Sequence, residues 1–157
     1  MSMASDLVVI DASGLNELFR QLTGPELLRR MNIAMLKWVA KIASTAAEDA
    51  PKDTGQLAAS LAYDVWVEAA DIWGVVYTPL MYGAVMEFGR EPGGMYPPKG
   101  ALLAWMGRHG WSEEEEDTLR YTISVKGIVP QPFLRPAAWA NEEFGRQALL
   151  DALTSEE

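Results

Sequence analysis

The sequence predicts an α+β fold, in which a long N-terminal amphipathic helix packs on a small antiparallel β-sheet and further helices follow. Three observations predict this class. Apolar residues recur every three or four positions before Pro51, two runs of β-branched and aromatic residues follow Gly55, and helical patterns return after Ala101. Strands and helices do not alternate along the chain, so a parallel sheet is not expected. With 157 residues, the chain is expected to form a single domain over 1–157, with flexible ends at about 1–5 and 154–157.

The N-terminal part predicts one strand and two helices. Leu7 to Ile10 is a short β-branched run that predicts the N-terminal strand of the sheet. Ser13 can cap a brief helix, and Thr23 and Glu26 have the spacing of a capping box at the start of the long helix, with Pro25 in its first turn. The apolar face of the long helix comprises Leu28, Met31, Met35, Val39, Ile42 and Ala46.

A β-hairpin is predicted from Leu61–Glu68 and Ile72–Tyr77, with residues 68–71 as its turn. Alternation along the first strand predicts that Tyr63, Val65 and Val67 face the core, so that Trp66 projects outward on the opposite face. Aromatic side chains are enriched at subunit interfaces, and Trp66 and Trp73 are therefore candidate interface residues.

The second half of the chain predicts helices joined by a proline-rich loop. Leu80 to Phe88 fits either a helical turn or a strand, and the prolines and glycines that follow exclude regular structure. Short helices are predicted over Ala101–Arg108 and from Ser112 to about Val125, the latter with a capping box formed by Ser112 and Glu115. The last helix is predicted from about Phe133 to Leu153.

Composition excludes several function classes. There is no cysteine, which excludes thiol catalysis and cysteine-based zinc sites, and His109 is the only histidine. The net charge is −9, mostly from Glu113–Asp117 and the segment 141–157, and no basic stripe of the kind that grips DNA is present. Neither a membrane-spanning segment nor a signal peptide is predicted. We expect no catalytic, cofactor-binding or metal-ligating residues, and hence no cofactor.

Asp53-Thr54-Gly55 is the triplet that aspartic proteases use, and it supports one alternative function. Those enzymes pair two such aspartates around a shared proton, so this chain would have to act as a homodimeric aspartic-type protease. The flanking residues Ala-Pro-Lys and Gln-Leu differ from the apolar strand that precedes a protease triplet. A turn in which the Asp53 carboxylate accepts nearby backbone N–H groups is the simpler interpretation.

Three stretches together resemble a known family. They are Ala50-Pro-Lys-Asp-Thr-Gly-Gln-Leu-Ala-Ala-Ser60, Tyr82-Gly-Ala-Val-Met-Glu-Phe-Gly89 and Lys126-Gly-Ile-Val-Pro-Gln-Pro-Phe-Leu-Arg-Pro-Ala137. Their order and spacing resemble the tailed-phage neck and minor tail-component family, the tail-completion and head–tail joining proteins of long-tailed phages. The similarity spans about residues 7 to 153. Arg90 departs from the family pattern, in which a small polar residue usually follows Glu-Phe-Gly.

The resemblance implies a structural virion protein, not an enzyme, that is assembled in the bacterial host cytoplasm and located in the neck or tail. Its partners would be further copies of itself in a hexameric ring, the head-closure ring, and the tail terminator or tail tube. Genomic DNA would pass through the ring without tight binding, and no membrane would be involved. By analogy the Asp53 turn sets the hairpin against the long helix, Glu87 to Gly89 anchor the following loop, and Pro132 to Ala137 dock the last helix. The motif residues are Pro51, Asp53, Thr54, Gly55, Leu57, Ser60, Glu87, Phe88, Gly89, Pro132, Phe133, Leu134 and Pro136.

Overall fold

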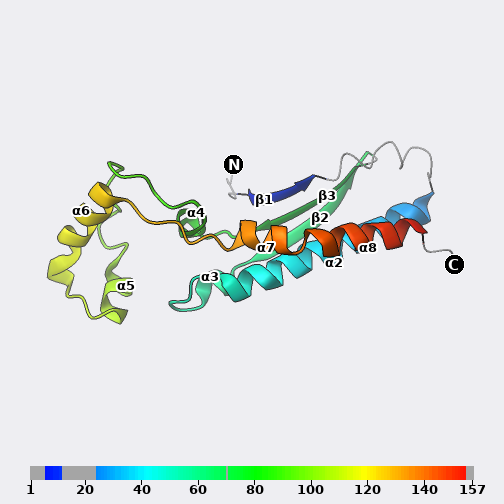
Figure 1. Cartoon of the computed structure of the whole chain (residues 1–157). Helices are drawn as coiled ribbons and strands as arrows, with labels where there is room; N and C mark the ends of the chain where they lie inside the picture. The colour runs from blue at the N-terminus through cyan, green and yellow to red at the C-terminus, as the bar shows by residue number, and fades with distance from the viewer. Residues whose placement is uncertain (1–5, 12–23, 70, 155–157) are drawn as a thin grey trace.

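The computed structural model describes residues 6–11, 24–69 and 71–154 and combines helices with an antiparallel sheet, as predicted (Figure 1). The predicted helix after Ser13 and most of the two predicted flexible ends lie outside these residues, whereas Thr154, predicted to belong to the flexible C-terminal end, is the last residue of a helix. The described elements are β1 (Asp6–Asp11), α2 (Pro25–Asp49), α3 (Gln56–Ala59), β2 (Ala62–Glu68), β3 (Asp71–Tyr77), α4 (Met81–Phe88), α5 (Leu103–Arg108), the short 3-10 helix η2 (Glu113–Glu115), α6 (Glu116–Lys126), α7 (Leu134–Ala140) and α8 (Glu142–Thr154).

The sheet has the order β1-β3-β2, and both pairings are antiparallel. The predicted hairpin is confirmed: Ala62 pairs with Tyr77 and Glu68 pairs with Asp71. Ala69 in the turn has a φ of +57°, which is unusual for a residue with a side chain and is tolerated in a tight reversal. Because β3 is central, β2 is left as one edge of the sheet.

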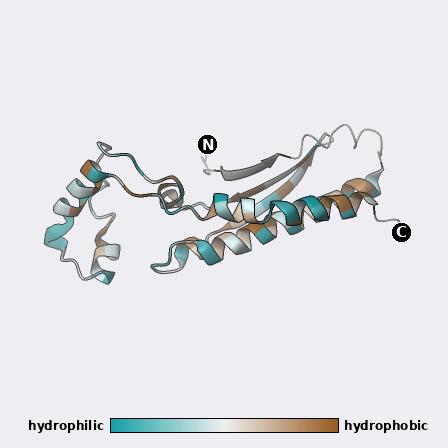
Figure 2. Cartoon of the chain, in the orientation of Figure 1, coloured by the Kyte–Doolittle hydropathy of each residue, from teal (hydrophilic) through white to brown (hydrophobic). Residues whose placement is uncertain are grey.

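Helix α2 lies across the sheet and supplies half of the buried side chains of the hydrophobic core. Hydrophobic and hydrophilic residues alternate along it in Figure 2, as an amphipathic helix requires. Pro25 stands in its first turn as predicted, and the residue that caps the helix is Gly24, with no side-chain cap. Glu26 pairs with Arg29, and Thr23 of the predicted capping box lies outside the described residues. The buried side chains of α2 are Leu27, Met31, Ala34, Met35, Val39, Ile42, Ala43 and Ala46.

The prediction for the hairpin faces is only partly right. Val65 packs against the core, but Tyr63 and Val67 remain 41% and 42% exposed. The reason is the position of β2 at the sheet edge. Helix α2 packs against both β2 and β3, and the missing side chain at Gly74 of β3 leaves room for Val39 of the helix.

The C-terminal segment forms two helices instead of the single helix predicted. The chain breaks at Asn141, whose buried side chain donates hydrogen bonds to the Ala137 carbonyl at 2.8 Å and to Thr45 Oγ1 at 3.0 Å. A side-chain amide that bonds the preceding turn competes with continued helix. The break lets α7 pack near β1 and α8 pack along α2.

Between α4 and α7 the chain leaves this body and forms a projection, which Figure 1 places at one end of the elongated molecule. We call residues 90–127 the arm. It contains α5, η2 and α6, and the predicted Ser112–Glu115 capping box is confirmed, with the Ser112 N–H donating to Glu115 Oε2 at 2.8 Å. The ambiguous segment before it is helical, as α4. No helix in the described ranges is long and apolar enough to cross a membrane.

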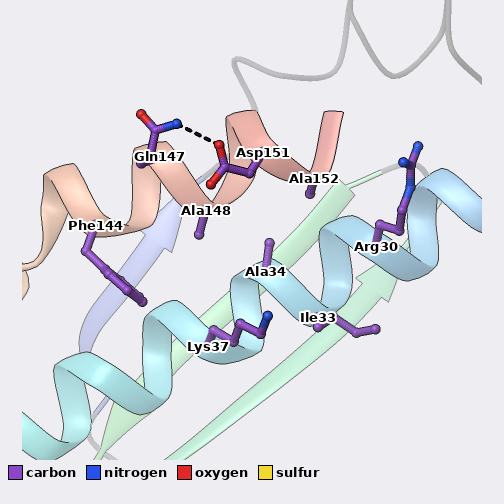
Figure 3. Close-up of a pocket in the computed structure, with 9 residues that line it drawn as sticks. All are labelled: Arg30, Ile33, Ala34, Lys37, Phe144, Gln147, Ala148, Asp151 and Ala152. Atoms are coloured by element: carbon purple, nitrogen blue, oxygen red, sulfur yellow. Dashed lines mark hydrogen bonds between the residues drawn. The ribbon is translucent and has the colours of Figure 1, made fainter. Parts of the chain in front are cut away.

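A shallow groove runs between α2 and α8 at the opposite end of the molecule (Figure 3). Its floor is formed by Ala34, Ala148 and Ala152, whose small side chains leave the space between the two helices unfilled. Its lining comprises Arg30, Ile33, Ala34, Lys37, Phe144, Gln147, Ala148, Asp151 and Ala152.

Gly145 sets how closely α8 approaches α2. A Cβ atom at position 145 would overlap the indole ring of Trp38. Gly145→Ala should therefore destabilise the protein by about 1–3 kcal/mol through overpacking, although alanine is the better helix former. Denaturant unfolding of the variant measures the change in the free energy of unfolding.

Gly107→Ala is the matched control, since Gly107 also lies in a helix but nothing is within 4 Å of the added Cβ. This control should be neutral or stabilised by up to about 1 kcal/mol. Equal effects of the two substitutions would show that the approach of α8 to Trp38 does not limit stability.

Candidate functional site

Two of the three stretches that carry the resemblance, residues 82–89 and 126–137, meet at the carboxylate of Glu87. We call them the second and third family-like stretches. Glu87 lies on α4 and its side chain is 0% exposed. Its Oε2 accepts the backbone N–H groups of Phe133 at 2.8 Å and Leu134 at 2.9 Å, and its Oε1 accepts the N–H of Arg135 at 3.0 Å. These donors belong to the first turn of α7, where backbone N–H groups have no partner within the helix. The carboxylate thus caps α7 from another element.

Arg135 completes the neutralisation of Glu87. Its Nε donates to Glu87 Oε1 at 2.9 Å, a second guanidinium nitrogen donates to the Glu87 backbone carbonyl at 3.1 Å, and the guanidinium lies over the ring of Phe88. Burial raises the pKa of Glu87, but the hydrogen bonds from Phe133, Leu134 and Arg135 outweigh it, so the pKa lies below its ordinary value of 4.5. The group is an ionised structural anchor.

The resemblance implied that Glu87 to Gly89 anchor the following loop, and this expectation is wrong for Glu87. Its partners lie on the returning chain, 46 to 48 residues further on. Phe133, Leu134 and Ala137 are fully buried in the core, in keeping with the expected docking of the last helix. Phe88, by contrast, is half exposed.

Gly89 and Gly127 shape the base of the arm. Their φ angles are +73° and +74°, a region that favours glycine, and the chain between α4 and α7 turns out and back at these points. Next to them Arg90 and Ile128 exchange two backbone hydrogen bonds of 2.8 Å. A Cβ on Gly89 would lie 2.6 Å from the Ile128 carbonyl oxygen. The two ends of the arm are therefore held side by side.

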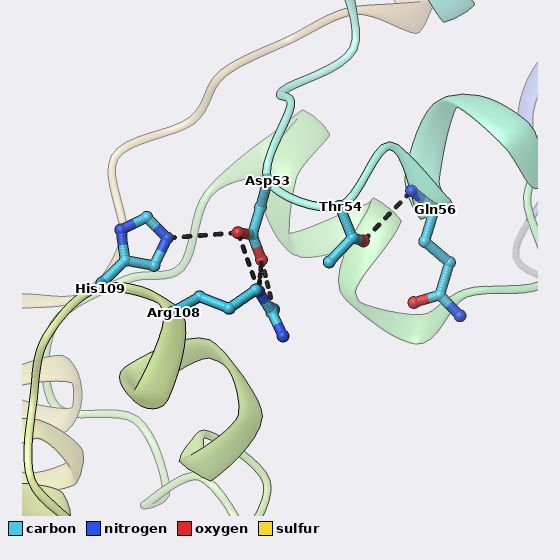
Figure 4. A network of polar contacts seen from close by, with 5 residues as sticks. All are labelled: Asp53, Thr54, Gln56, Arg108 and His109. Carbon is cyan, nitrogen blue, oxygen red and sulfur yellow. Dashed lines mark hydrogen bonds and ion pairs between the residues drawn. The ribbon is translucent and has the colours of Figure 1, made fainter.

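A second contact, around Asp53, connects the body to the C-terminal end of α5 in the arm (Figure 4). Both carboxylate oxygens of Asp53 accept hydrogen bonds from Arg108 Nε, at 3.1 and 3.0 Å, and Arg108 Nη2 makes a further ion pair with Oδ2. His109 Nε2 lies 3.3 Å from Oδ1, and the imidazole stacks on Trp105. The Arg108 guanidinium holds the pKa of Asp53 below its usual value. The expected bonds of Asp53 to nearby backbone, and its contact with the hairpin, are replaced by this pairing with α5.

The other residues of the Asp53 turn have local roles. Gly55 has a φ of +76° and precedes α3, and Thr54 Oγ1 accepts the N–H of Gln56 at 3.3 Å. Leu57 is buried in the core. The Ser60 hydroxyl donates to the Leu57 carbonyl. It also shares a 2.7 Å hydrogen bond with Oγ1 of Thr78, the residue that follows β3. Pro51 follows the last residue of α2 and its C-cap, while Pro132 and Pro136 flank the start of α7.

Trp66 and Trp73 lie opposite each other on β2 and β3, on the sheet face away from α2. Their rings stack with centroids 6.4 Å apart, and Trp66 is 42% exposed. Tyr77, on the same face, donates to Asp64 Oδ2 at 3.1 Å. The two candidate interface residues thus form one aromatic surface, which we call the hairpin face.

Sequence reasoning missed Arg108, His109, Arg135 and Thr78, each of which bonds a predicted motif residue. Only Arg135 could have been found, because it stands inside the third stretch, in the first turn of α7. No cluster of three or more acidic or histidine side chains that could hold a metal ion is present in the described ranges.

Comparison of the chain with protein-family models, with curated proteins and with solved structures found no match.

The Glu87 anchor generates a pH-dependent prediction. Glu87→Gln replaces an acceptor oxygen with a donor amide against backbone donors, and should destabilise the fold by about 3 kcal/mol at neutral pH. The folded-state pKa is depressed, so the stabilisation is fully present above the ordinary pKa of 4.5 and is lost as the pH falls through the lower folded-state value. Unfolding measured by circular dichroism from pH 7 to pH 3 should show wild type and variant converging in acid.

Glu91→Gln serves as the control, because Glu91 is an exposed carboxylate just beyond α4. It should unfold like the wild type at neutral pH. A Glu87→Gln protein with wild-type stability at pH 7 would contradict the anchoring role.

Proposed function

We propose that the chain is a structural virion protein of a tailed bacteriophage, a neck or tail-completion subunit that joins the head-closure and tail-terminator rings. The observation that carries the proposal is the meeting of two family-like stretches at one buried group. Glu87 of the second stretch caps the helix that begins in the third. Residues that are far apart in the sequence but share one anchor support the resemblance better than separate short motifs would.

The shape and surface of the chain support an assembly role. The arm buries little of its apolar surface: Met106 is buried, whereas Met95 is 85% exposed and Tyr96, Trp111, Tyr121 and Val125 are also exposed. The hairpin face adds two stacked tryptophans. Apolar surface of this kind on a small protein is typical of sites that neighbouring subunits cover. Closed rings use heterologous contacts, so two different faces of each subunit must be available.

No observation favours the alternative, an aspartic-type protease built on Asp53. A shared-proton pair requires one of its two carboxylates to accept a proton easily. The ion pair with Arg108 disfavours protonation of Asp53. Asp53→Asn separates the two functions, because it would abolish proteolysis in an enzyme and leave particle assembly intact in a ring subunit.

The proposed function is tested in the phage genome that carries the coding sequence. Deletion of the gene should yield DNA-filled heads and separate, unjoined tails under the electron microscope. Supplying the wild-type or the Asp53→Asn protein from a plasmid should restore joined particles. Normal particles without the gene, or absence of the protein from purified virions, would overturn the proposal.

The hairpin face should contribute to assembly. Trp66→Glu introduces a charge at an exposed position, so the monomer should stay folded while ring formation is blocked. Circular dichroism checks the fold, and sedimentation velocity measures the oligomer. Trp66→Phe, which keeps an aromatic ring, should still assemble, and assembly of Trp66→Glu at wild-type concentrations would show that this face is not an interface.

Duplex DNA should not bind the protein measurably at near-physiological salt. Five arginines, Arg29, Arg108, Arg120, Arg135 and Arg146, are held in ion pairs with carboxylates. DNA-binding proteins instead present clustered cations that release counterions. Fluorescence anisotropy with a labelled duplex tests this: micromolar binding that weakens steeply with salt would contradict the expectation that the genome passes without tight binding.

A further inference from the structure

We infer that the end of the arm of one copy docks in the α2–α8 groove of the next copy. The inference rests on the proposed function, since it names one pair of surfaces, in addition to the hairpin face, through which the proposed ring subunits meet. The two surfaces are the groove and the acidic end of the arm, residues 111–117.

The groove combines an apolar floor with positive charge. Ala34, Ala148 and Ala152 are small, and Ile33 and Phe144 are exposed beside them. Figure 3 shows the Phe144 ring reaching from α8 towards α2. Lys37 is exposed in the lining, and the one carboxylate there, Asp151, accepts a 2.7 Å hydrogen bond from Gln147. The groove therefore suits an aromatic or aliphatic side chain that is accompanied by a carboxylate.

The end of the arm presents that combination. Trp111 is partly exposed and directly precedes the acidic run. Glu115 caps η2, Asp117 pairs with Arg120, and Glu116 is buried and accepts the Gly100 N–H. Glu113 and Glu114 are exposed, and their carboxylates make no hydrogen bond or ion pair within the described part of the chain. Two carboxylates thus lie beside an exposed indole, opposite in sign to Lys37.

The two surfaces cannot meet within one copy. Figure 1 places α5 and α6 at one end of the molecule and the facing stretches of α2 and α8 towards the other. The base of the arm is held by the Arg90–Ile128 hydrogen bonds, and Arg108 of the arm pairs with Asp53 of the body. A contact between unlike surfaces at opposite ends is heterologous, and repeated contacts of this type close into a ring or continue as a filament.

Charge reversal tests the contact. Lys37→Glu alone, or Glu113→Lys/Glu114→Lys alone, should weaken self-association by about tenfold or more, because like charges then meet. Lys52→Glu and Glu48→Lys/Asp49→Lys are matched controls at exposed positions outside both surfaces. Sedimentation velocity over a range of protein concentrations measures the effect. An equimolar mixture of the two reversed proteins should regain association, since each wild-type arm then finds a wild-type groove and each reversed arm a reversed groove.

The absence of cysteine allows a direct test of proximity. The double variant Lys37→Cys/Glu114→Cys should form covalent chains longer than dimers on mild oxidation. Each single variant can form at most a dimer.

The outcomes separate this contact from the proposed function. A wild-type protein that forms closed oligomers, unaffected by either charge reversal, overturns the arm–groove contact and leaves the ring proposal standing. If the wild type stays monomeric at every concentration and the double-cysteine variant gives no products beyond dimers, the contact and the self-associating ring both fail. Association of the groove with an acidic peptide of another protein, but not with the arm, would assign the groove to a different partner and overturn the inference.

Discussion

The structure depends on satisfying one buried negative charge. Transfer of a carboxylate from water into a protein interior costs several kcal/mol unless donors replace the lost water. Glu87 obtains three backbone donors and a guanidinium, and all four belong to Phe133, Leu134 and Arg135. The chain after the arm must therefore return to α4. That return also delivers Phe133 and Leu134 into the core, so one polar contact and one apolar contact are formed together.

The body and the arm are held together by different forces. In the body, α2 is covered by the sheet on one side and by α7 and α8 on another, and its buried side chains form a continuous apolar core. The arm has few buried side chains and is ordered mainly by polar contacts, such as Ser124 with the Gly94 carbonyl and Arg120 with the Pro97 carbonyl. Each polar contact adds only a small net stabilisation, because it replaces hydrogen bonds to water. Burial of apolar surface adds stabilisation in proportion to the area buried. An arm built this way gains most from a partner that covers its aromatic residues.

The charged residues fall into two groups. Some form ion pairs within the chain, and others are exposed on the surface, where they can meet opposite charges on a partner. The buried carboxylate of Glu87 pairs with Arg135, and the more exposed carboxylate of Asp53 pairs with Arg108. Exposed carboxylates cluster at Glu113 to Glu115 on the arm, and Lys37 and Lys41 are exposed on α2. Exposed charges of this kind add little affinity by themselves, but they orient an approaching partner and reject incorrect ones.

Local patterns in the sequence determined the long helix, the hairpin and the capped start of η2. The periodicity of α2, the β-branched runs of β2 and β3, and the Ser112–Glu115 cap all depend on neighbours within a few residues. Tertiary structure alone decided which partners the motif residues have. Asp53 bonds Arg108 55 residues away, Glu87 caps α7 from another element, and Asn141 breaks a helical pattern because Thr45 of α2 lies beside it. Such contacts depend on where the arm leaves and rejoins the body, at Gly89 and Gly127, and a carboxylate or amide carries no local signal of which distant donor it will meet. For the same reason the exposure of Tyr63 and Val67 followed from the edge position of β2 and not from their alternation.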